Sequence, residues 1–467
     1  MKDLQASGEW WLPGQGNRHL YGALRSDQSG SLTLETLDAF VDVDFSVAAY
    51  TPLPIVLGTA DGKHFTLEGV WAIRDTSTAT AYRVEHAFVG EHIDSVGSLL
   101  FDRAVVQYSD LPEWVNAPAL NLSFQKASGL RLEVRYRDLE AKEVVLDDGS
   151  KIRFTSGTRT DQDRLRSITI HQEYAIELVL ARPLTMETLV RGFSWPLQTL
   201  VTLGVGRPQR ITSLRLHRPD TMTSSAEESG PREPFPIEVL YAQAEVNPGL
   251  GLRRPGLDML FSLNDLGDTF QSHISKWVSR AELLRPVYNF YFASVFSSFM
   301  LMDHQFLDVV QAVEAYHRRV YGGHYVDQEA FDRVYIAVVE AIPATTAHTL
   351  RDALKRRLQY HNEFSLRRRL KDLIRRHEQL ASPVLPGPKS FVDEVTDTRN
   401  YLTHLDDELR PKARTSGEAL LAMTQRLRVL LQVCFLREMG LPDDTTTGMI
   451  RNSYAFKYIA SVIDPGS

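Results

Sequence analysis

The sequence predicts a multidomain α+β protein, in which a β-rich, sandwich- or barrel-like domain at residues 1–265 precedes an all-α helical bundle at residues 266–467. The chain has 467 residues, too many for a single hydrophobic core. Apolar residues alternate with a period of two in the first half and recur with helical spacing in the second. The charge divides as well. Residues 271–467 hold 26 basic and 23 acidic residues, a balance of +3, and the remaining 26 and 36 give residues 1–270 a balance of −10.

Tight hairpins are predicted at two Asp-Gly turns in the first half, because Asp-Gly between β-rich runs is a strong short-range hairpin signal. The turns and their flanking runs are Asp61-Gly62 between 55–57 and 65–67, and Asp148-Gly149 between 144–146 and 151–154. A longer strand is predicted from Ile168 to Leu180, where the even positions are nearly all apolar. A polar loop at 221–236 and a further strand at 237–241 complete the predicted sandwich or barrel.

Helical spacing and short connections predict an antiparallel bundle in the second half. The predicted helices are 306–320, 328–341, 347–359, 365–379, 390–409 and 417–439. In the fifth of these, Ser390 is the expected N-cap. Its expected buried face consists of Phe391, Val395, Leu402, Leu405 and Leu409.

The composition excludes several classes of protein. The net charge of −7 and the pI near 6.1 exclude a polycation, so any nucleic-acid contact must be local. The single cysteine, Cys434, rules out an internal disulfide and a Cys-rich zinc cage. The first residues lack the apolar stretch of a signal peptide, and the apolar stretch 287–302 is shorter than a membrane span. We therefore expect a buried helix at 287–302 and a cytoplasmic protein.

Motifs for cofactors and metals are incomplete. Gly204-Val205-Gly206 lacks the third glycine of a dinucleotide fingerprint, and the chain has no G-x-S-x-G nucleophile elbow. Glu314 and His317 form one Glu-x-x-His, whereas a carboxylate-bridged di-metal bundle needs two such pairs. We expect no cofactor and no metal.

One constellation has a clear chemical interpretation, the segment from Arg399 to His404 with Asn400 beside the arginine. Histidine titrates near neutrality and can take or give a proton. Arginine offers a permanent forked cation for the charge of a transition-state phosphate, and Asn400 can orient either side chain. In RNA the 2′-OH is an internal nucleophile, so positioning and charge stabilisation suffice for cleavage. The alternative is an ordinary solvated helix face.

Two further sets of residues are candidates with an open alternative. Glu314 and His317 lie on a helix that can face the helix of Arg399 and His404. Either Glu314 orients His404 or Arg399, or Glu314 and His317 form a buried polar pair that ties two helices together. A dense basic region either contacts an RNA backbone or is a solvated face with intrahelical pairs. It comprises Arg356, Arg357, Arg367, Arg368, Arg369, Lys371, Arg375 and Arg376.

The segment Val395–His404 closely resembles the signature of HEPN domains (higher eukaryotes and prokaryotes nucleotide-binding), an Arg commonly followed by Asn, with a His five positions after the Arg. The helix 306–319 resembles the opening helix of the ApeA-type HEPN subfamily, and a further stretch matches it at Asn362, Ser365, Arg369 and Leu370. The first half resembles the ApeA N-terminal domain at Phe65–Leu67, Gly90–His92 and 101–114.

This resemblance implies a bacterial antiphage factor, an abortive-infection toxin whose HEPN domain is a metal-independent endoribonuclease with tRNA as a target. It also implies a homodimer, or a larger homo-oligomer, in which two copies of the motif helix form one composite site. Cleavage through the 2′-OH would leave a 2′,3′-cyclic phosphate and a 5′-OH. By the resemblance, His404 is the acid/base, Arg399 the phosphate stabiliser and Asn400 the orienting residue. The first domain would sense a phage-derived trigger or position the substrate. The alternative is a non-catalytic HEPN-like scaffold that binds nucleotide or RNA, or dimerises.

Overall fold

The structure is a computed structural model of the chain, with two compact units, Met1–Ser279 and Arg280–Ser467. It describes residues 4–15, 17–27, 31–41, 52–76, 78–95, 97, 99–125, 131–137, 139–163, 166–219, 235–241, 259–296, 300–381, 385 and 387–463. The loop predicted at 221–236 lies outside this set except for its last two residues. The domain boundary at residue 265 stays a prediction.

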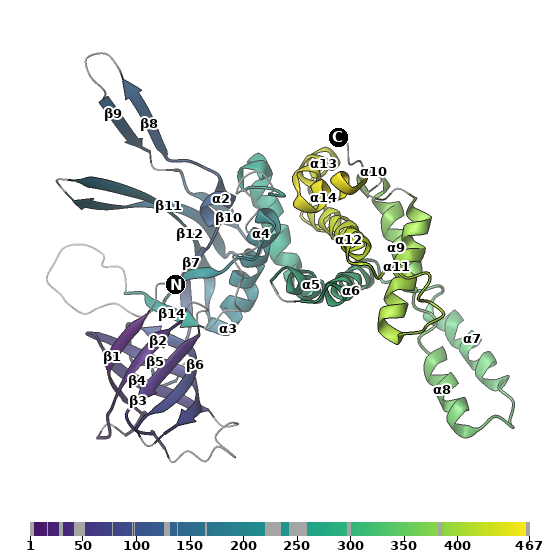
Figure 1. Cartoon of the computed structure of the whole chain (residues 1–467), viewed down its shortest axis with the longest axis horizontal. Coiled ribbons are helices and arrows are strands. Elements are labelled where there is room, and N and C mark those ends of the chain that lie inside the picture. Colours follow the sequence, from purple (N-terminus) through teal and green to yellow (C-terminus); the bar gives the residue numbers. More distant parts are fainter. Residues whose placement is uncertain are drawn as a thin grey trace. The chain divides into compact units, whose positions relative to one another are not determined.

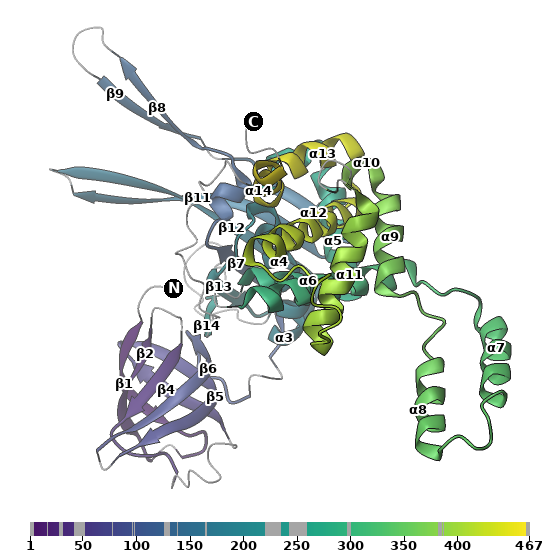
Figure 2. The same cartoon turned by 45° about the vertical axis from the view of Figure 1, so that its right-hand side comes forward.

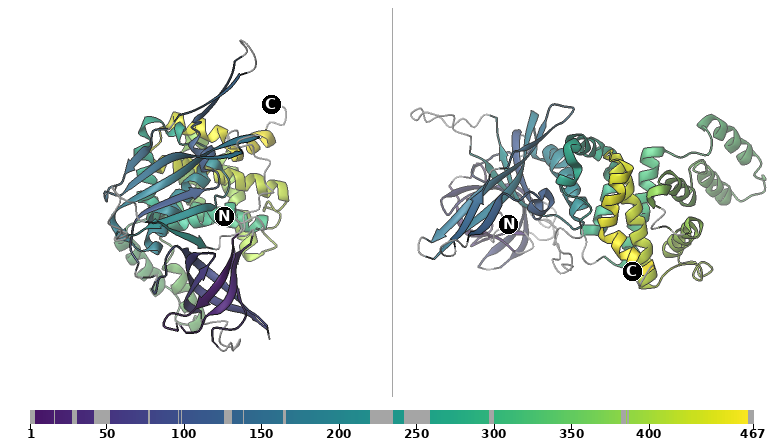
Figure 3. Two further views of the ribbon diagram at one scale, coloured as in Figure 1. Left: turned by 90° about the vertical axis from the view of Figure 1, so that its left-hand side faces the viewer. Right: turned by 90° about the horizontal axis from the view of Figure 1, so that it is seen from above.

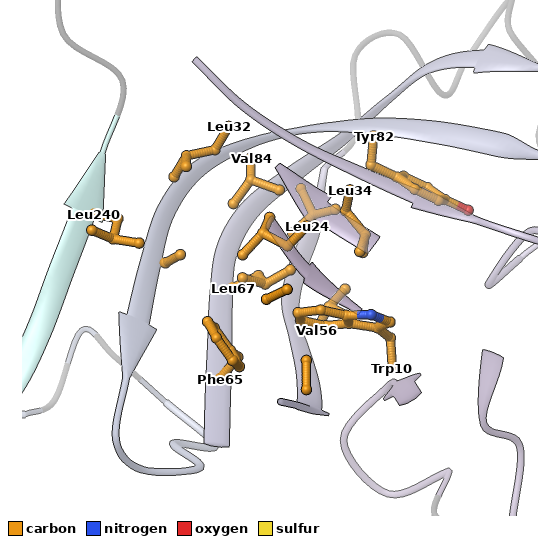
Figure 4. Packing of buried hydrophobic residues seen from close by; sticks show 14 of the residues in the cluster. Trp10, Leu24, Leu32, Leu34, Val56, Phe65, Leu67, Tyr82, Val84 and Leu240 are labelled. Carbon is orange, nitrogen blue, oxygen red and sulfur yellow. The ribbon is translucent and has the colours of Figure 1, made fainter. Parts of the chain in front are cut away.

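The first unit begins with a closed barrel of six antiparallel strands (Figure 1). The strands are β1 (Gln5–Trp11), β2 (Leu20–Ser26), β3 (Leu32–Thr36), β4 (Leu53–Ala60), β5 (Lys63–Asp75) and β6 (Thr80–Val89). They pair in the order β1-β2-β3-β6-β5-β4, and β4 returns to β1. Alternate side chains fill the interior, among them Trp10, Leu24, Val56 and Phe65 (Figure 4). The predicted barrel-like fold is confirmed.

Beyond β6 the same hydrogen-bonded sheet continues as an outer segment (Figure 3). Its strands follow in the order β14 (Ile237–Tyr241), β13 (Ile211–His217), β7 (Phe101–Tyr108), β12 (Ser167–Leu184), β11 (Lys151–Asp163) and β10 (Lys142–Val145). Among the strands that the structure describes, β8 (Leu120–Gln125) and β9 (Arg131–Tyr136) pair only with each other. The helices of this unit include α2 (Leu111–Val115), α3 (Met186–Leu189) and α4 (Trp195–Val205).

Both predicted hairpins and both predicted strands are present. Asp61 and Gly62 have φ of 48° and 72°, the left-handed pair that a two-residue hairpin turn requires. In β12 the predicted alternation buries Ile176 and Leu178 but leaves Ile168 71 % exposed. The reason is pairing, because β12 pairs with β7 only from Ile176 onward, and among the described strands β11 alone pairs with its first part.

The second unit is helical, as predicted. Its helices are the end of α5 (Phe270–Phe296), α6 (Met302–Tyr321), α7 (Gln328–Glu340), α8 (His348–Leu358), α9 (Leu366–Arg376), α10 (Glu378–Ala381), α11 (Pro388–His404), α12 (Gly417–Glu438), α13 (Asp443–Asn452) and α14 (Tyr454–Ile463). The apolar stretch 287–302 is therefore not one buried helix: α5 ends at Phe296 and α6 begins at Met302.

Helix α12 is the central helix of this unit. Among the described residues it alone is long and apolar enough to cross a membrane, but 72 % of its most apolar stretch is buried. It packs against α6, α13 and α14. Its length and apolar character are therefore accounted for by its place in the core.

Helix α11 differs from its predicted bounds at both ends. It begins at Pro388 after an N-cap at Gly387, and the Ser390 hydroxyl donates to the Gly387 carbonyl 2.8 Å away, so the prediction of Ser390 as N-cap was wrong. It ends at His404, because Leu405 adopts the left-handed conformation with φ of 52°. The predicted buried face therefore stops early, and Leu405 is 70 % exposed.

Candidate functional site

Helix α11 carries Arg399, Asn400 and His404, and its buried side fixes its position. Phe391, Val392 and Val395 are buried, and α11 packs against α6 and α9. The buried Thr398 hydroxyl accepts a hydrogen bond from the Arg414 backbone N–H at 2.9 Å, which ties the following loop back to the helix. These contacts fix the rotation of the helix and so determine where the motif side chains lie.

Arg399 lies at the edge between the buried and the exposed side of α11. Its Nη1 donates to Asn400 Oδ1 at 3.1 Å, and its Nη2 lies 3.8 Å from Oε2 of Glu314 on α6. The Arg399 side chain is 29 % exposed. Three predicted site residues thus meet in one group, although Glu314 is far from the other two in sequence. The carboxylate and the amide oxygen hold the guanidinium at the surface without covering it.

His404 is the last residue of α11 and is exposed. Among the residues that the structure describes, its side chain has no hydrogen-bond partner. Five helical residues turn by roughly 140° beyond one full turn, so Arg399 and His404 point to different sides of the helix. Asn400 and His404, four residues apart, share a face. One chain therefore presents a cation and an imidazole at the same helix end without joining them.

His317 lies one helical turn beyond Glu314 but in a different environment. It is 1 % exposed, its Nε2 donates to Asp372 Oδ2 at 3.0 Å, and its Nδ1 accepts from Arg369 Nη1 at 3.0 Å. Burial lowers the pKa of His317, and the hydrogen bond to Asp372 opposes this only in part. The structure places His317 in a buried polar group between α6 and α9, apart from Arg399.

The basic region divides into buried, paired and exposed residues. Arg369 is 1 % exposed and donates to the carbonyls of Gly322 and Phe364, so it lies out of reach of an RNA backbone. Arg375 and Arg376 bind Asp372. Arg367 pairs with Asp393 and Asp397 on α11. The residues that are exposed and lie outside these ion pairs are Arg356 and Arg357 on α8 and Arg368 and Lys371 on α9.

Asp372 is a residue that sequence reasoning missed. Burial alone would raise the pKa of its carboxyl group, but hydrogen bonds from Arg376, His317 and Arg375 outweigh it and hold the pKa at about 2. A signal was present, because Asp372 and Arg376 have the i, i+4 spacing of a helical ion pair. Within the described residues, no three His, Cys, Asp or Glu side chains gather as a metal site would require.

Two family models match the chain. The model of ApeA N-terminal domain 1 matches residues 5–277, more than half of the chain, and the model of the Apea-like HEPN domain matches residues 307–445. No curated protein and no solved structure matches. The second match contains Glu314, Arg399, Asn400 and His404. The resemblance found in the sequence is thereby confirmed for both halves.

Proposed function

Because the chain belongs to the ApeA family and carries an ApeA-like HEPN domain, the mark of HEPN-type abortive-infection nucleases, we propose that it is a metal-independent endoribonuclease that cleaves tRNA. One observation carries the proposal: Glu314 and Asn400 hold Arg399 at the surface, and the same helix ends in an exposed His404. A positioned cation and a free imidazole are the two groups that cleavage through the 2′-OH requires.

The proposed reaction is an internal transfer at phosphorus. The 2′-oxygen attacks the adjacent phosphate, and the bond from phosphorus to the 5′-oxygen of the next nucleotide breaks. His404 either takes the proton of the 2′-OH or gives one to the departing 5′-oxygen, and Arg399 stabilises the added negative charge. The products are a 2′,3′-cyclic phosphate and a 5′-OH.

Two copies of the chain would supply the full set of groups. Arg399 and His404 of one chain point to different sides of α11, so one chain does not direct both groups at the same phosphate. In a dimer, each copy contributes one arginine and one histidine, and groups from both copies can surround a single phosphate. A homodimer through the helical domain therefore fits the site, with His404 of the two copies converging. We place this assembly in the bacterial cytoplasm, where its tRNA substrate lies. The β-rich unit would keep the site inactive until a phage-derived trigger arrives.

The decisive experiment is cleavage of total tRNA by the purified protein in EDTA. We expect RNA fragments with 2′,3′-cyclic phosphate ends from the wild type and almost none from His404→Ala. Cleavage at equal rates by both proteins would sink the assignment.

The second candidate is a scaffold that binds a phosphate without cutting. It is favoured by the absence of any partner for His404 in the described part of one chain. Expression in bacteria separates the two functions. The nuclease predicts growth arrest by the wild type and normal growth with Arg399→Ala, whereas the scaffold predicts equal growth.

A further inference from the structure

A helical arm at residues 324–363 is inserted between α6 and α9 and carries α7 and α8. Its two ends are clamped together. Asn362, which is buried, accepts from the Val326 backbone N–H at 3.1 Å and donates to the Val326 carbonyl at 3.0 Å. Just outside, the Phe364 N–H donates to the Gly323 carbonyl at 2.9 Å. Figure 2 shows α7 and α8 away from the other helices of this unit. These hydrogen bonds join the two ends of the arm, so the arm is a separate substructure of this unit.

The arm has no core of its own. Neither α7 nor α8 contains a buried residue. The side of α7 with Phe331, Tyr335 and Val339 is half-buried, but a second apolar surface has no cover: Val334 is 56 % exposed and Ile336 is 54 % exposed. A helix that is apolar on several sides normally lies inside a larger bundle. Two helices alone cannot supply that bundle.

The two helices of the arm carry opposite charges. Helix α7 has Glu329, Asp332 and Glu340 against Arg333, a balance of −2. Helix α8 has four basic residues against one acidic residue, a balance of +3. The exposed side of α8 also carries apolar groups, with Leu350 54 % exposed and Ala353 beside it. Each helix thus offers an apolar strip with charges that the other type of helix complements.

We propose that the arms of two copies of this chain pack against each other, with α7 of each copy on α8 of the other. This arrangement has twofold symmetry, forms the same contact twice and produces an intermolecular four-helix bundle. It covers the exposed valine and leucine side chains and sets the acidic helix against the basic one. The inference deepens the proposed function, because a composite site requires two copies, and it assigns part of their interface to residues 324–363.

A second copy explains the arm better than RNA does. The exposed apolar side chains of α7 are aliphatic, so they offer a nucleotide neither a hydrogen bond nor an aromatic face for stacking. The acidic balance of α7 would repel a phosphate backbone. Only α8 taken alone has the charge of an RNA-binding surface.

The first test introduces charge into the apolar strip. We expect Val334→Glu/Val338→Glu to convert dimers into monomers in sedimentation experiments, at concentrations where the wild type is dimeric. Because both positions are exposed, the melting temperature of the monomeric unit should stay unchanged. Ile168→Glu, an exposed apolar position on β12, is the matched control and should stay dimeric. A double variant with the wild-type mass would overturn the inference.

The second test uses charge reversal. One variant carries Glu329→Lys/Glu340→Lys on α7 and the other Arg356→Glu/Arg357→Glu on α8. Each alone places like charges at both contacts and should be mainly monomeric. Mixed together, they place opposite charges at both contacts and should form heterodimers. Absence of heterodimers overturns the inference, as does weaker tRNA binding by the variants with no change in mass, which would make the arm an RNA surface.

The same experiments separate this inference from the proposed function. Arm variants that stay dimeric and cleave tRNA refute the arm interface and leave the nuclease intact. Wild-type protein that dimerises through the arm, as these variants establish, but never cleaves tRNA refutes the nuclease and leaves the interface intact.

Discussion

Glu314 and His317 lie one turn apart on α6, yet they belong to two opposite kinds of charged group. His317 lies in a closed group with Arg369 and Asp372, in which both ring nitrogens are hydrogen-bonded and the charges are buried. Glu314 lies in an open group, 3.8 Å from a partly exposed Arg399, whose helix ends in His404, an exposed imidazole without a hydrogen-bond partner among the described residues. Residue type alone does not separate the two groups, but burial and completeness of pairing do.

The energetic consequences differ accordingly. A buried charge is tolerated only when its partners are all present, because an uncompensated charge in the interior is very costly. The closed group is therefore sensitive in stability and has no group to spare for a substrate. A surface ion pair contributes little to stability, so the open group can change with little effect on folding. In the proposed function, this group acts on the phosphate of a bound RNA, by stabilising its charge and by transferring a proton.

The largest expected effect comes from the open group. His404→Ala should lower the rate of tRNA cleavage by about 10²- to 10⁴-fold, the typical contribution of a general acid or base. The melting temperature should not change, because His404 is exposed. Single-turnover cleavage and thermal unfolding measure the two quantities. His304→Ala, which removes another exposed histidine from the helical unit, is the control, and an equal loss of activity in it would contradict the distinction.

The closed group should show the reverse pattern. Arg369→Ala removes a buried guanidinium that donates to His317 Nδ1 and to the carbonyls of Gly322 and Phe364, and it should lower the free energy of unfolding by about 3–5 kcal/mol. Its neighbour Arg368 is exposed, with its guanidinium 5.3 Å from the centre of the Phe364 ring, so Arg368→Ala should cost less than about 1 kcal/mol. Urea unfolding measures both. Similar losses for the two variants would show that burial is not the deciding factor.

Local sequence signals predicted the elements that local chemistry determines. The Asp-Gly turns, the alternation in β12 and the helical spacing of α6 to α12 depend on residues close in sequence. The closure of the barrel depends on β1 pairing with β4 and β6 with both β3 and β5, which no local pattern encodes. The length of β12 was predictable, but the exposure of its first part depends on where β7 ends.

The candidate site was predictable in part for the same reason. Asn400 and His404 share a face of one helix, which spacing alone shows. The contact from Arg399 to Glu314 and the burial of His317 depend on how α6 packs against α9 and α11, which only the tertiary structure provides. The end of α11 was missed because leucine seldom adopts the left-handed conformation that stops the helix at Leu405. The prediction that Arg369 contacts RNA was wrong, because the sequence does not show that this side chain is buried.

A second buried histidine, His377, makes the stability of the helical unit sensitive to acid. Burial, followed by the charges of Arg437 and Arg376, lowers the pKa of His377 to about 4. The unfolded chain takes up a proton near pH 6.5, so stability is complete above that pH and falls as the pH drops toward 4. Between pH 6.5 and 5 the loss should be about 2 kcal/mol. Urea unfolding of wild type and His377→Gln tests this, and an unchanged pH slope in the variant would refute it.

The smallest effect, and the sharpest test of the open group, is Glu314→Gln. The Glu314 carboxylate touches no substrate in the proposed mechanism but restricts the Arg399 guanidinium, so it is a positioning residue. Misplacement of a catalytic group by about 1 Å costs up to 10²-fold, and a glutamine that keeps the shape but loses the charge should cost roughly tenfold in kcat with KM unchanged. Stability should change by less than about 1 kcal/mol, because the pair is partly exposed. Asp308→Asn, which removes another carboxylate from α6 about 9 Å along the helix, is the control. If Glu314 has a purely structural role, Glu314→Gln should instead lower the free energy of unfolding and leave kcat unchanged. Glu314 would then belong with His317 among the residues that only stabilise the fold.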